Sequence, residues 1–191
     1  MTCADVSVDE LVQTVYLKIK QMKRELTLTD IAGYLPYGLK VQEAYQDIWT
    51  IRQLGNIDPC RDGDVGLVSS AGNYEQYTYI ADIRPILRPM SDLYKEITDK
   101  DYNDGKPFVP LVELARVKFP CFDNYDLNAS GVLVDCSMED GFCSEWYNYD
   151  EGKLSSDEFD LLHQFKFDYR GLIAADLAVN VNHLQQNPYE E

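Results

Sequence analysis

The chain has few of the residue patterns that mark a catalytic or metal centre. Histidine occurs only twice, and the five cysteines include no Cys-x-x-Cys pair. Because structural zinc is held by clustered cysteine and histidine, the spacing disfavours a zinc site. No glycine-rich loop precedes a Lys-Ser or Lys-Thr pair, which a phosphate-binding loop requires. The sequence therefore predicts a protein that is not an enzyme, with no metal and no cofactor.

Long apolar runs are also missing. No uncharged apolar stretch approaches the length of about 20 residues that a membrane-spanning helix needs. The N-terminal residues carry Asp5, Asp9 and Glu10, and they contain no apolar core of a secretory signal. The cysteine count is odd, whereas disulfide frameworks of secreted proteins pair their cysteines. We therefore expect a cytoplasmic protein with reduced thiols and no membrane partner.

Basic residues are scarce. The chain holds 17 Lys and Arg against 33 Asp and Glu, for a formal net charge of −16. Clustered Lys and Arg are needed to contact nucleic-acid phosphates, and the one cluster, Lys18–Arg24, lies on the flank of a predicted helix. Direct nucleic-acid binding is therefore disfavoured. An acidic surface attracts cationic partners, and a solvated acidic face that only aids solubility is the alternative.

Apolar residues are abundant enough for one core. At 191 residues, with 45% hydrophobic and 12% aromatic side chains, the chain can fold without disulfides or metal. We predict an α+β fold: a single compact domain, residues 1–191, with an N-terminal amphipathic helix, a small mostly antiparallel sheet and two or three further short helices. Residues 121–160 are a possible acidic insert in this domain.

Helix signals occur at several places. Ser7 and Glu10 form a capping box, and the apolar residues behind it recur at spacings of three and four. Ser155 and Glu158 form a second capping box. Further helical segments are predicted at 30–34, capped by Thr29, at 92–97, capped by Ser91, and at 111–119, between Pro110 and Pro120. The apolar face of the first helix comprises Val8, Val12, Val15, Ile19, Met22 and Leu26.

Strand signals lie between these helices. Alternating or β-branched residues predict two strands of a hairpin or meander at residues 39–41 and 48–54. Residues 132–134 and 142–147 predict two further strands around a turn at residues 137–141. Residues 77–83 read as another strand, and residues 177–181 as a last one. Residues 56–72 are rich in Gly, Asp and Ser, which predicts a loop.

Three stretches of the chain form a recognisable set: residues 28–41, 86–93 and 167–179. Together, in this order, they resemble small uncharacterised proteins encoded by phages, prophages and mobile elements of gut anaerobic bacteria. The resemblance implies a phage-type accessory protein in the host cytosol and supplies no catalytic residues. This chain departs from the usual pattern in a longer, more acidic segment between Asp123 and Asp160.

The acidic segment is the predicted functional surface. The 48 residues from Cys121 to Asp168 hold 12 acidic and 2 basic residues. The chain has 14 Tyr against 7 Phe, and tyrosine combines an apolar ring with a polar tip that suits contacts. We expect a non-catalytic protein that binds a host or phage protein, one with a basic surface, through acidic and aromatic side chains. The candidate residues are Glu139, Asp140, Glu145, Trp146, Tyr147, Tyr149, Asp150 and Glu151.

Three other functions stay open. The carboxylates of a nucleic-acid mimic could occupy the phosphate sites of a host defence enzyme, which demands a basic partner and a steep salt dependence. A virion or assembly component should self-associate or bind a portal. An enzyme with a metal held by carboxylates should lose activity on chelation. The sequence leaves the oligomeric state undetermined.

The helical spacing behind Ser7 generates a test. If Val15 lies on a buried helix face, Val15→Asp buries an unpaired charge and should destabilise the fold by several kcal/mol, on the order of the penalty for such a group. The measurement is thermal unfolding of the variant and its parent. An unchanged melting temperature would show that this face is not part of the core.

Overall fold

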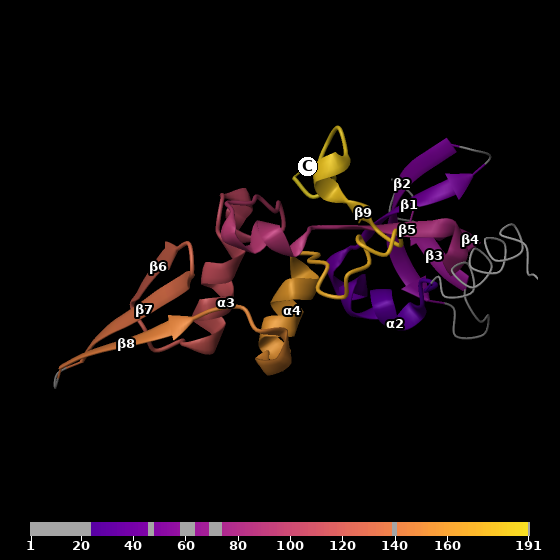
Figure 1. The fold of residues 1–191 in the computed structure, drawn as a ribbon. Coiled ribbons are helices and arrows are strands. Elements are labelled where there is room, and N and C mark those ends of the chain that lie inside the picture. The colour runs from indigo at the N-terminus through magenta and orange to yellow at the C-terminus, as the bar shows by residue number, and fades with distance from the viewer. Residues whose placement is uncertain (1–23, 46–47, 58–63, 69–73, 139–140, 191) are drawn as a thin grey trace, which may run out of the picture.

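A computed structural model describes residues 24–45, 48–57, 64–68, 74–138 and 141–190. These residues form a single α+β domain, as the sequence predicts, with a β-sheet at either end and two helices between them (Figure 1). The predicted N-terminal amphipathic helix lies outside the described residues, except for Leu26, which is buried. Within the described part, no helix has the length and apolar character to cross a membrane.

The larger sheet has six strands in the order β4-β3-β2-β1-β5-β9. All its pairings are antiparallel except that of β9, which runs parallel to β5. The predicted hairpin of β1 and β2 is confirmed. The strands are β1 Lys40–Tyr45, β2 Ile48–Ile57, β3 Asp64–Val68, β4 Tyr74–Tyr79, β5 Ile83–Leu87 and β9 Val179–Asn180.

The prediction of a loop over 56–72 is wrong. Strand β2 extends to Ile57, and β3 pairs with both β2 and β4. Val65 and Leu67 alternate with Gly66 and are fully or almost fully buried. Strand β3 is only five residues long and lies among Gly, Asp and Ser residues, so the composition of the whole stretch predicted a loop.

Short helices lead into and out of the larger sheet. Helix α2, Leu28–Ile31, begins after Thr27, whose backbone N–H and hydroxyl donate to the Asp30 carboxylate at 3.0 and 2.8 Å. The cap is therefore Thr27 and not Thr29 as predicted, because Thr27 stands three residues before that acid. The 3-10 helix η1, Ala32–Tyr37, follows and ends at Gly38, whose φ of 67° is left-handed.

Two further predictions around β5 need correction. The predicted strand 77–83 is interrupted by the 3-10 helix η2, Ile80–Asp82. The predicted helix 92–97 is the 3-10 helix η3, Met90–Tyr94, which follows Pro89 and has no side-chain cap, so Ser91 does not cap it. The 3-10 helices η4, Asn103–Gly105, and η6, Val181–His183, complete the connections.

The smaller sheet has the order β6-β7-β8 and is antiparallel throughout. It consists of β6 Asn124–Asn128, β7 Gly131–Met138 and β8 Gly141–Tyr147, so the two strands predicted around a turn are confirmed. Helices α3, Pro110–Lys118, and α4, Ser156–Gln164, start at the predicted proline and capping box. Residues 121–160 thus form a sheet, the 3-10 helix η5 (Glu151–Lys153) and part of α4. Their core is shared with α3 and includes Leu111, Leu114, Val132, Val134, Tyr147 and Leu162.

The two halves meet where the chain after α4 runs beside the end of β5. Arg88 donates its backbone N–H to the carbonyl of Lys166 at 2.8 Å and accepts the N–H of Asp168 at 2.8 Å. Between these bonds lies Phe167, fully buried, whose carbonyl accepts the Tyr34 hydroxyl at 2.7 Å. We call residues 88 and 166–168 the junction. It holds η1, β5 and α4 together.

The Tyr34 hydrogen bond generates a test. Tyr34→Phe keeps the ring but leaves the buried Phe167 carbonyl without this donor, and we expect a loss of about 1–3 kcal/mol in unfolding free energy. The measurement is denaturant unfolding. Tyr94→Phe is the control, because the Tyr94 hydroxyl bonds Asn148 at an exposed site and its loss should cost little. Equal losses in both variants would contradict a special role for Tyr34.

Candidate protein-binding surface

The predicted site residues lie along β8 and the segment that follows it. Glu139 and Asp140 fall outside the described residues, between β7 and β8. Glu145 and Asp150 are exposed, Tyr149 is half-buried, and Glu151 begins η5. The segment therefore does bring several of these residues to one end of the molecule, at the smaller sheet (Figure 1).

Strand alternation separates the two aromatic residues of β8. Tyr147 pairs with Val132 and is only 5% exposed, so it belongs to the core shared with α3 rather than to a binding surface. Trp146 pairs with Leu133 and is 45% exposed. Successive side chains of a strand point to opposite faces, and this period decides which aromatic ring reaches solvent.

Tyr147 has a structural partner in α4. Its hydroxyl donates to Glu158 at 2.7 Å, and Glu158 is 1% exposed. The same carboxylate accepts the N–H and hydroxyl of Ser155 at 2.7 and 2.8 Å, and Lys118 lies 3.7 Å away. Burial alone would raise the pKa of Glu158, but these hydrogen bonds and Lys118 lower it below its ordinary value. Burial, together with the bond to Glu158, raises the pKa of Tyr147.

Register places two aspartates on the same sheet face as Trp146. Across the three strands, Asp126 pairs with Leu133 and Leu133 pairs with Trp146. Two residues along β7 from Leu133, Asp135 lies opposite Ser144. By alternation all five share the sheet face that turns away from Val132 and Val134. We call Asp126, Leu133, Asp135, Ser144 and Trp146 the Trp146 surface.

Sequence reasoning found Trp146 but missed Asp126 and Asp135. Their place on the face of Trp146 follows from strand register, which a single sequence does not reveal. One carboxylate oxygen of Asp135 is buried and has no hydrogen-bond partner among the described residues.

A groove borders the Trp146 surface at the end of β8. It has a volume of about 460 Å³ and is lined by Trp146, Tyr149, Lys118 and Lys153, among others. Asp150 stands at its rim, where it accepts the Gly152 N–H at 3.2 Å and pairs with Lys153 at 3.0 Å. The hydrogen bond from Lys153 lowers the pKa of Asp150, followed by that from Gly152. The carboxylate therefore stays charged at neutral pH.

A single glycine allows this groove edge to form. Gly131 has a φ of 148°, and a Cβ at this position would lie 2.3 Å from the Tyr147 carbonyl oxygen and 3.4 Å from the Trp146 indole nitrogen. Strand β7 can therefore begin against the end of β8 only because residue 131 carries no side chain. The close approach fixes the backbone that presents Trp146.

Two observations bear on chemistry and ancestry. Within the residues that the structure describes, no group of three or more His, Cys, Asp or Glu side chains could hold a metal ion. Comparison with protein-family models, with curated proteins and with solved structures finds no match.

The Tyr147–Glu158 pair generates a test with a pH readout. Because the folded-state pKa of Glu158 is lowered, its contribution to stability is present above the ordinary glutamate pKa and is lost as the pH falls through the lowered value. Tyr147→Phe removes one of the bonds that lower it. We expect about 1–3 kcal/mol less stability at neutral pH and a shallower loss of stability on acidification.

The measurement is denaturant unfolding between about pH 3 and pH 7. Glu145→Gln is the matched control, since it removes an exposed carboxylate from the same strand and should change neither quantity. A Tyr147→Phe profile that runs parallel to the parent at all pH values would contradict the assigned role of the hydrogen bond.

Proposed function

We propose that this is a non-catalytic, cytoplasmic accessory protein that binds a basic protein partner through the Trp146 surface. The observation that supports it best is an exposed tryptophan, 45% accessible, set on a sheet face with two aspartates. The likeness of three sequence stretches to phage-encoded proteins supports a host or phage protein as the partner.

Tryptophan beside carboxylates suits an arginine-rich or lysine-rich partner. Tryptophan is enriched among the residues that contribute most to protein interfaces, and its ring face attracts guanidinium and ammonium groups. The chain shows the same pairing internally, because the Arg84 guanidinium lies 5.4 Å from the centre of the Trp49 ring. Among the described residues no such cation lies over Trp146, so that ring face is left for a partner.

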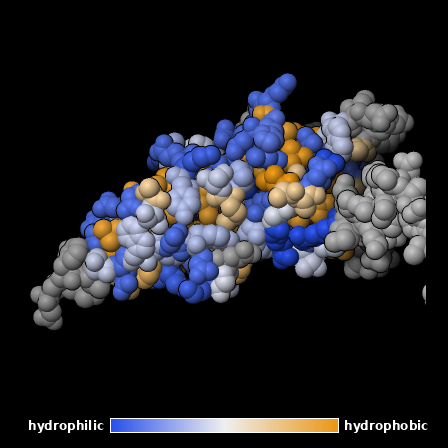
Figure 2. All heavy atoms as spheres, viewed as in Figure 1, coloured by the Kyte–Doolittle hydropathy of each residue, from blue (hydrophilic) through white to orange (hydrophobic). Residues whose placement is uncertain are grey.

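The surrounding charge favours the same partner. The 12 acidic residues between Cys121 and Asp168 outnumber the 2 basic ones. Such a field steers a cationic protein toward the surface and speeds association, and salt weakens this effect. Apolar residues reach the surface elsewhere too, as Figure 2 shows toward the larger sheet. The other exposed tryptophan, Trp49 of β2, already has the Arg84 guanidinium over its ring.

The chain has two tryptophans, which permits a direct optical test. In a Trp49→Phe protein, Trp146 is the sole indole, and titration with an arginine-rich peptide should change its emission. An equally long glutamate-rich peptide should not, and salt should weaken the response. Trp146→Ala should then reduce capture of a basic partner from host lysate, while Trp49→Ala should not. Equal capture by both variants would rule out this surface.

A charge variant separates steering from contact. Changing Glu139, Asp140, Glu145, Asp150 and Glu151 to Gln or Asn should leave the fold stable, because relieved repulsion offsets lost surface pairs. Association with the basic partner should become slower, with little change in the dissociation rate. Stopped-flow mixing at low salt measures both rates. Unchanged kinetics would mean that the acidic segment only aids solubility.

A further inference from the structure

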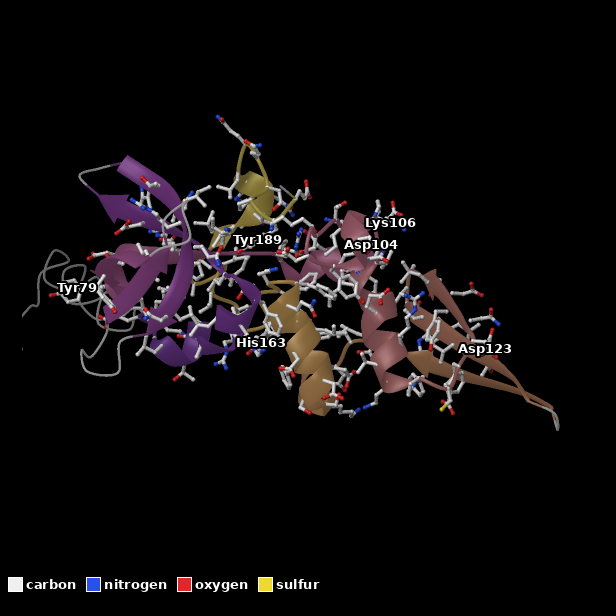
Figure 3. The ribbon with its side chains drawn as sticks, turned by 180° about the vertical axis from the view of Figure 1, so that it is seen from behind. Tyr79, Asp104, Lys106, Asp123, His163 and Tyr189 are labelled. Carbon is white, nitrogen blue, oxygen red and sulfur yellow. The ribbon has the colours of Figure 1, made fainter. Side chains whose placement is uncertain are left out.

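A second cavity lies between the two halves of the molecule, away from the Trp146 surface. Its volume is about 390 Å³, and its walls come from η1, β1, β2, the turn at residues 99–101, the end of α4 and the C-terminal residues 188–189. Figure 3 shows Tyr189 in this central position, between the sheets. The lining includes Lys40, Lys100 and Lys166. Three lysines in one cavity of an acidic protein call for an explanation.

Lys166 is the most unusual of them. Its side chain is 3% exposed, and its ammonium pairs with the equally buried Asp99 at 3.1 Å. The same ammonium lies 4.9 Å from the centre of the Tyr189 ring. Its backbone φ of 60° is left-handed, a conformation in which Gly or Asn is favoured after a helix. A lysine placed there costs both backbone strain and desolvation, a combination that accumulates at functional sites.

Lys40 has no directly paired carboxylate among the described residues. Its ammonium donates to the neutral Gln53 amide at 3.0 Å, and it forms no ion pair within the described residues. The two aspartates are committed elsewhere: Asp99 to Lys166, and Asp101 to Lys100 at 3.2 Å. Burial lowers the pKa of Lys40 and repulsion from Lys100 lowers it further, while attraction to Asp101 offsets part of this. An anion between Lys40 and Lys100 would relieve that repulsion.

The Lys40 side chain is not needed to hold the cavity together. The Tyr189 hydroxyl donates to the Ile86 carbonyl at 2.8 Å and accepts the backbone N–H of Lys40 at 3.1 Å. The C-terminal segment is therefore fixed by main-chain groups and one phenol. This separates the side chain of Lys40, a residue that lines the cavity, from the contacts that hold the C-terminal segment.

We propose that this cavity binds a small organic anion whose carboxylate or phosphate group pairs with Lys40 and Lys100 and accepts a hydrogen bond from Lys166. Charge-assisted hydrogen bonds of this kind are the strong ones. The walls contributed by Pro36, Tyr37 and Pro188 suit an apolar or planar group attached to the anion. Pockets with a few convergent polar groups and apolar walls are typical of small-molecule sites.

The probes are phenyl phosphate and inorganic phosphate, with phenol as the uncharged control. Titration calorimetry of the full chain in a phosphate-free buffer should give a Kd for phenyl phosphate below about 1 mM. Inorganic phosphate should bind more weakly, and phenol should give no heat. Absence of heat from both phosphates up to about 10 mM would overturn the proposal.

Variants locate the binding. Lys40→Met keeps the length of the side chain and should raise the Kd about tenfold or more, whereas Lys40→Arg should restore most of the affinity. Lys106→Met is the matched control, since Lys106 is 73% exposed and lies outside the cavity (Figure 3). Equal affinities of Lys40→Met and Lys106→Met would overturn the site. The melting temperature of Lys40→Met should match the parent, because the Tyr189 bond uses the backbone of residue 40.

A measurement on the unaltered protein complements the variants. Acetic anhydride modifies neutral amines, and bound phenyl phosphate should protect Lys40 from it while Lys106 reacts as before. Unprotected Lys40 at saturating phenyl phosphate would contradict the assignment. Trp146→Ala should retain the affinity for phenyl phosphate. The two proposals can therefore fail separately: loss of protein binding at the Trp146 surface would not affect anion binding in the cavity, and loss of anion binding would not affect protein binding.

Discussion

The arrangement of the two halves depends on one pair of backbone hydrogen bonds at the junction. Arg88 continues β5 and bonds the main chain of Lys166 and Asp168, which follow α4. Because β5 belongs to the larger sheet and α4 packs with α3 on the smaller one, these two bonds join the two halves. Fully buried Phe167 lies between the bonds and is itself bonded by Tyr34. The Asp168 carboxylate then accepts the N–H groups of Leu172 and Ile173, at 2.7 and 2.8 Å, and turns the chain back toward the larger sheet.

The tyrosine excess finds its explanation mainly inside the molecule. Several phenol groups each donate a hydrogen bond to an acceptor inside the molecule, while the ring fills core volume. The sequence left two uses open for the tyrosines, packing in half-buried strands and surface contacts, and for four of them the structure shows a mainly structural use. These are Tyr34 to the Phe167 carbonyl, Tyr125 to the Phe119 carbonyl, Tyr147 to Glu158 and Tyr189 to the Ile86 carbonyl.

Local signals predicted local structure. The Ser155–Glu158 box and Pro110 specify helix starts within four residues, and α4 and α3 begin there. Thr27 and Thr29 are both plausible caps, and only the three-residue spacing to Asp30 distinguishes them. Strand β3 was not predicted because its five residues are stabilised by pairing with both β2 and β4, and that pairing cannot be deduced from the five residues themselves. The Trp146 surface was predicted only in part for the same reason. The sequence identifies Trp146 as a candidate, but Asp126 and Asp135 come to share its sheet face only through strand register. The lysine cavity joins residues as far apart as Lys40 and Tyr189, 149 positions along the chain, so no local pattern could reveal it.

The long separation between Lys40 and Tyr189 also constrains the order of folding. Closing a loop of that length costs more entropy than closing the hairpin of β7 and β8 or the turn between α3 and the smaller sheet, so contacts local in sequence form first. We expect Tyr189 to dock after the transition state. Loss of its hydroxyl would then speed unfolding and leave the folding rate almost unchanged. The central cavity would be the last part of the molecule to close during folding and the first to open, and a ligand held there would act chiefly by slowing its opening.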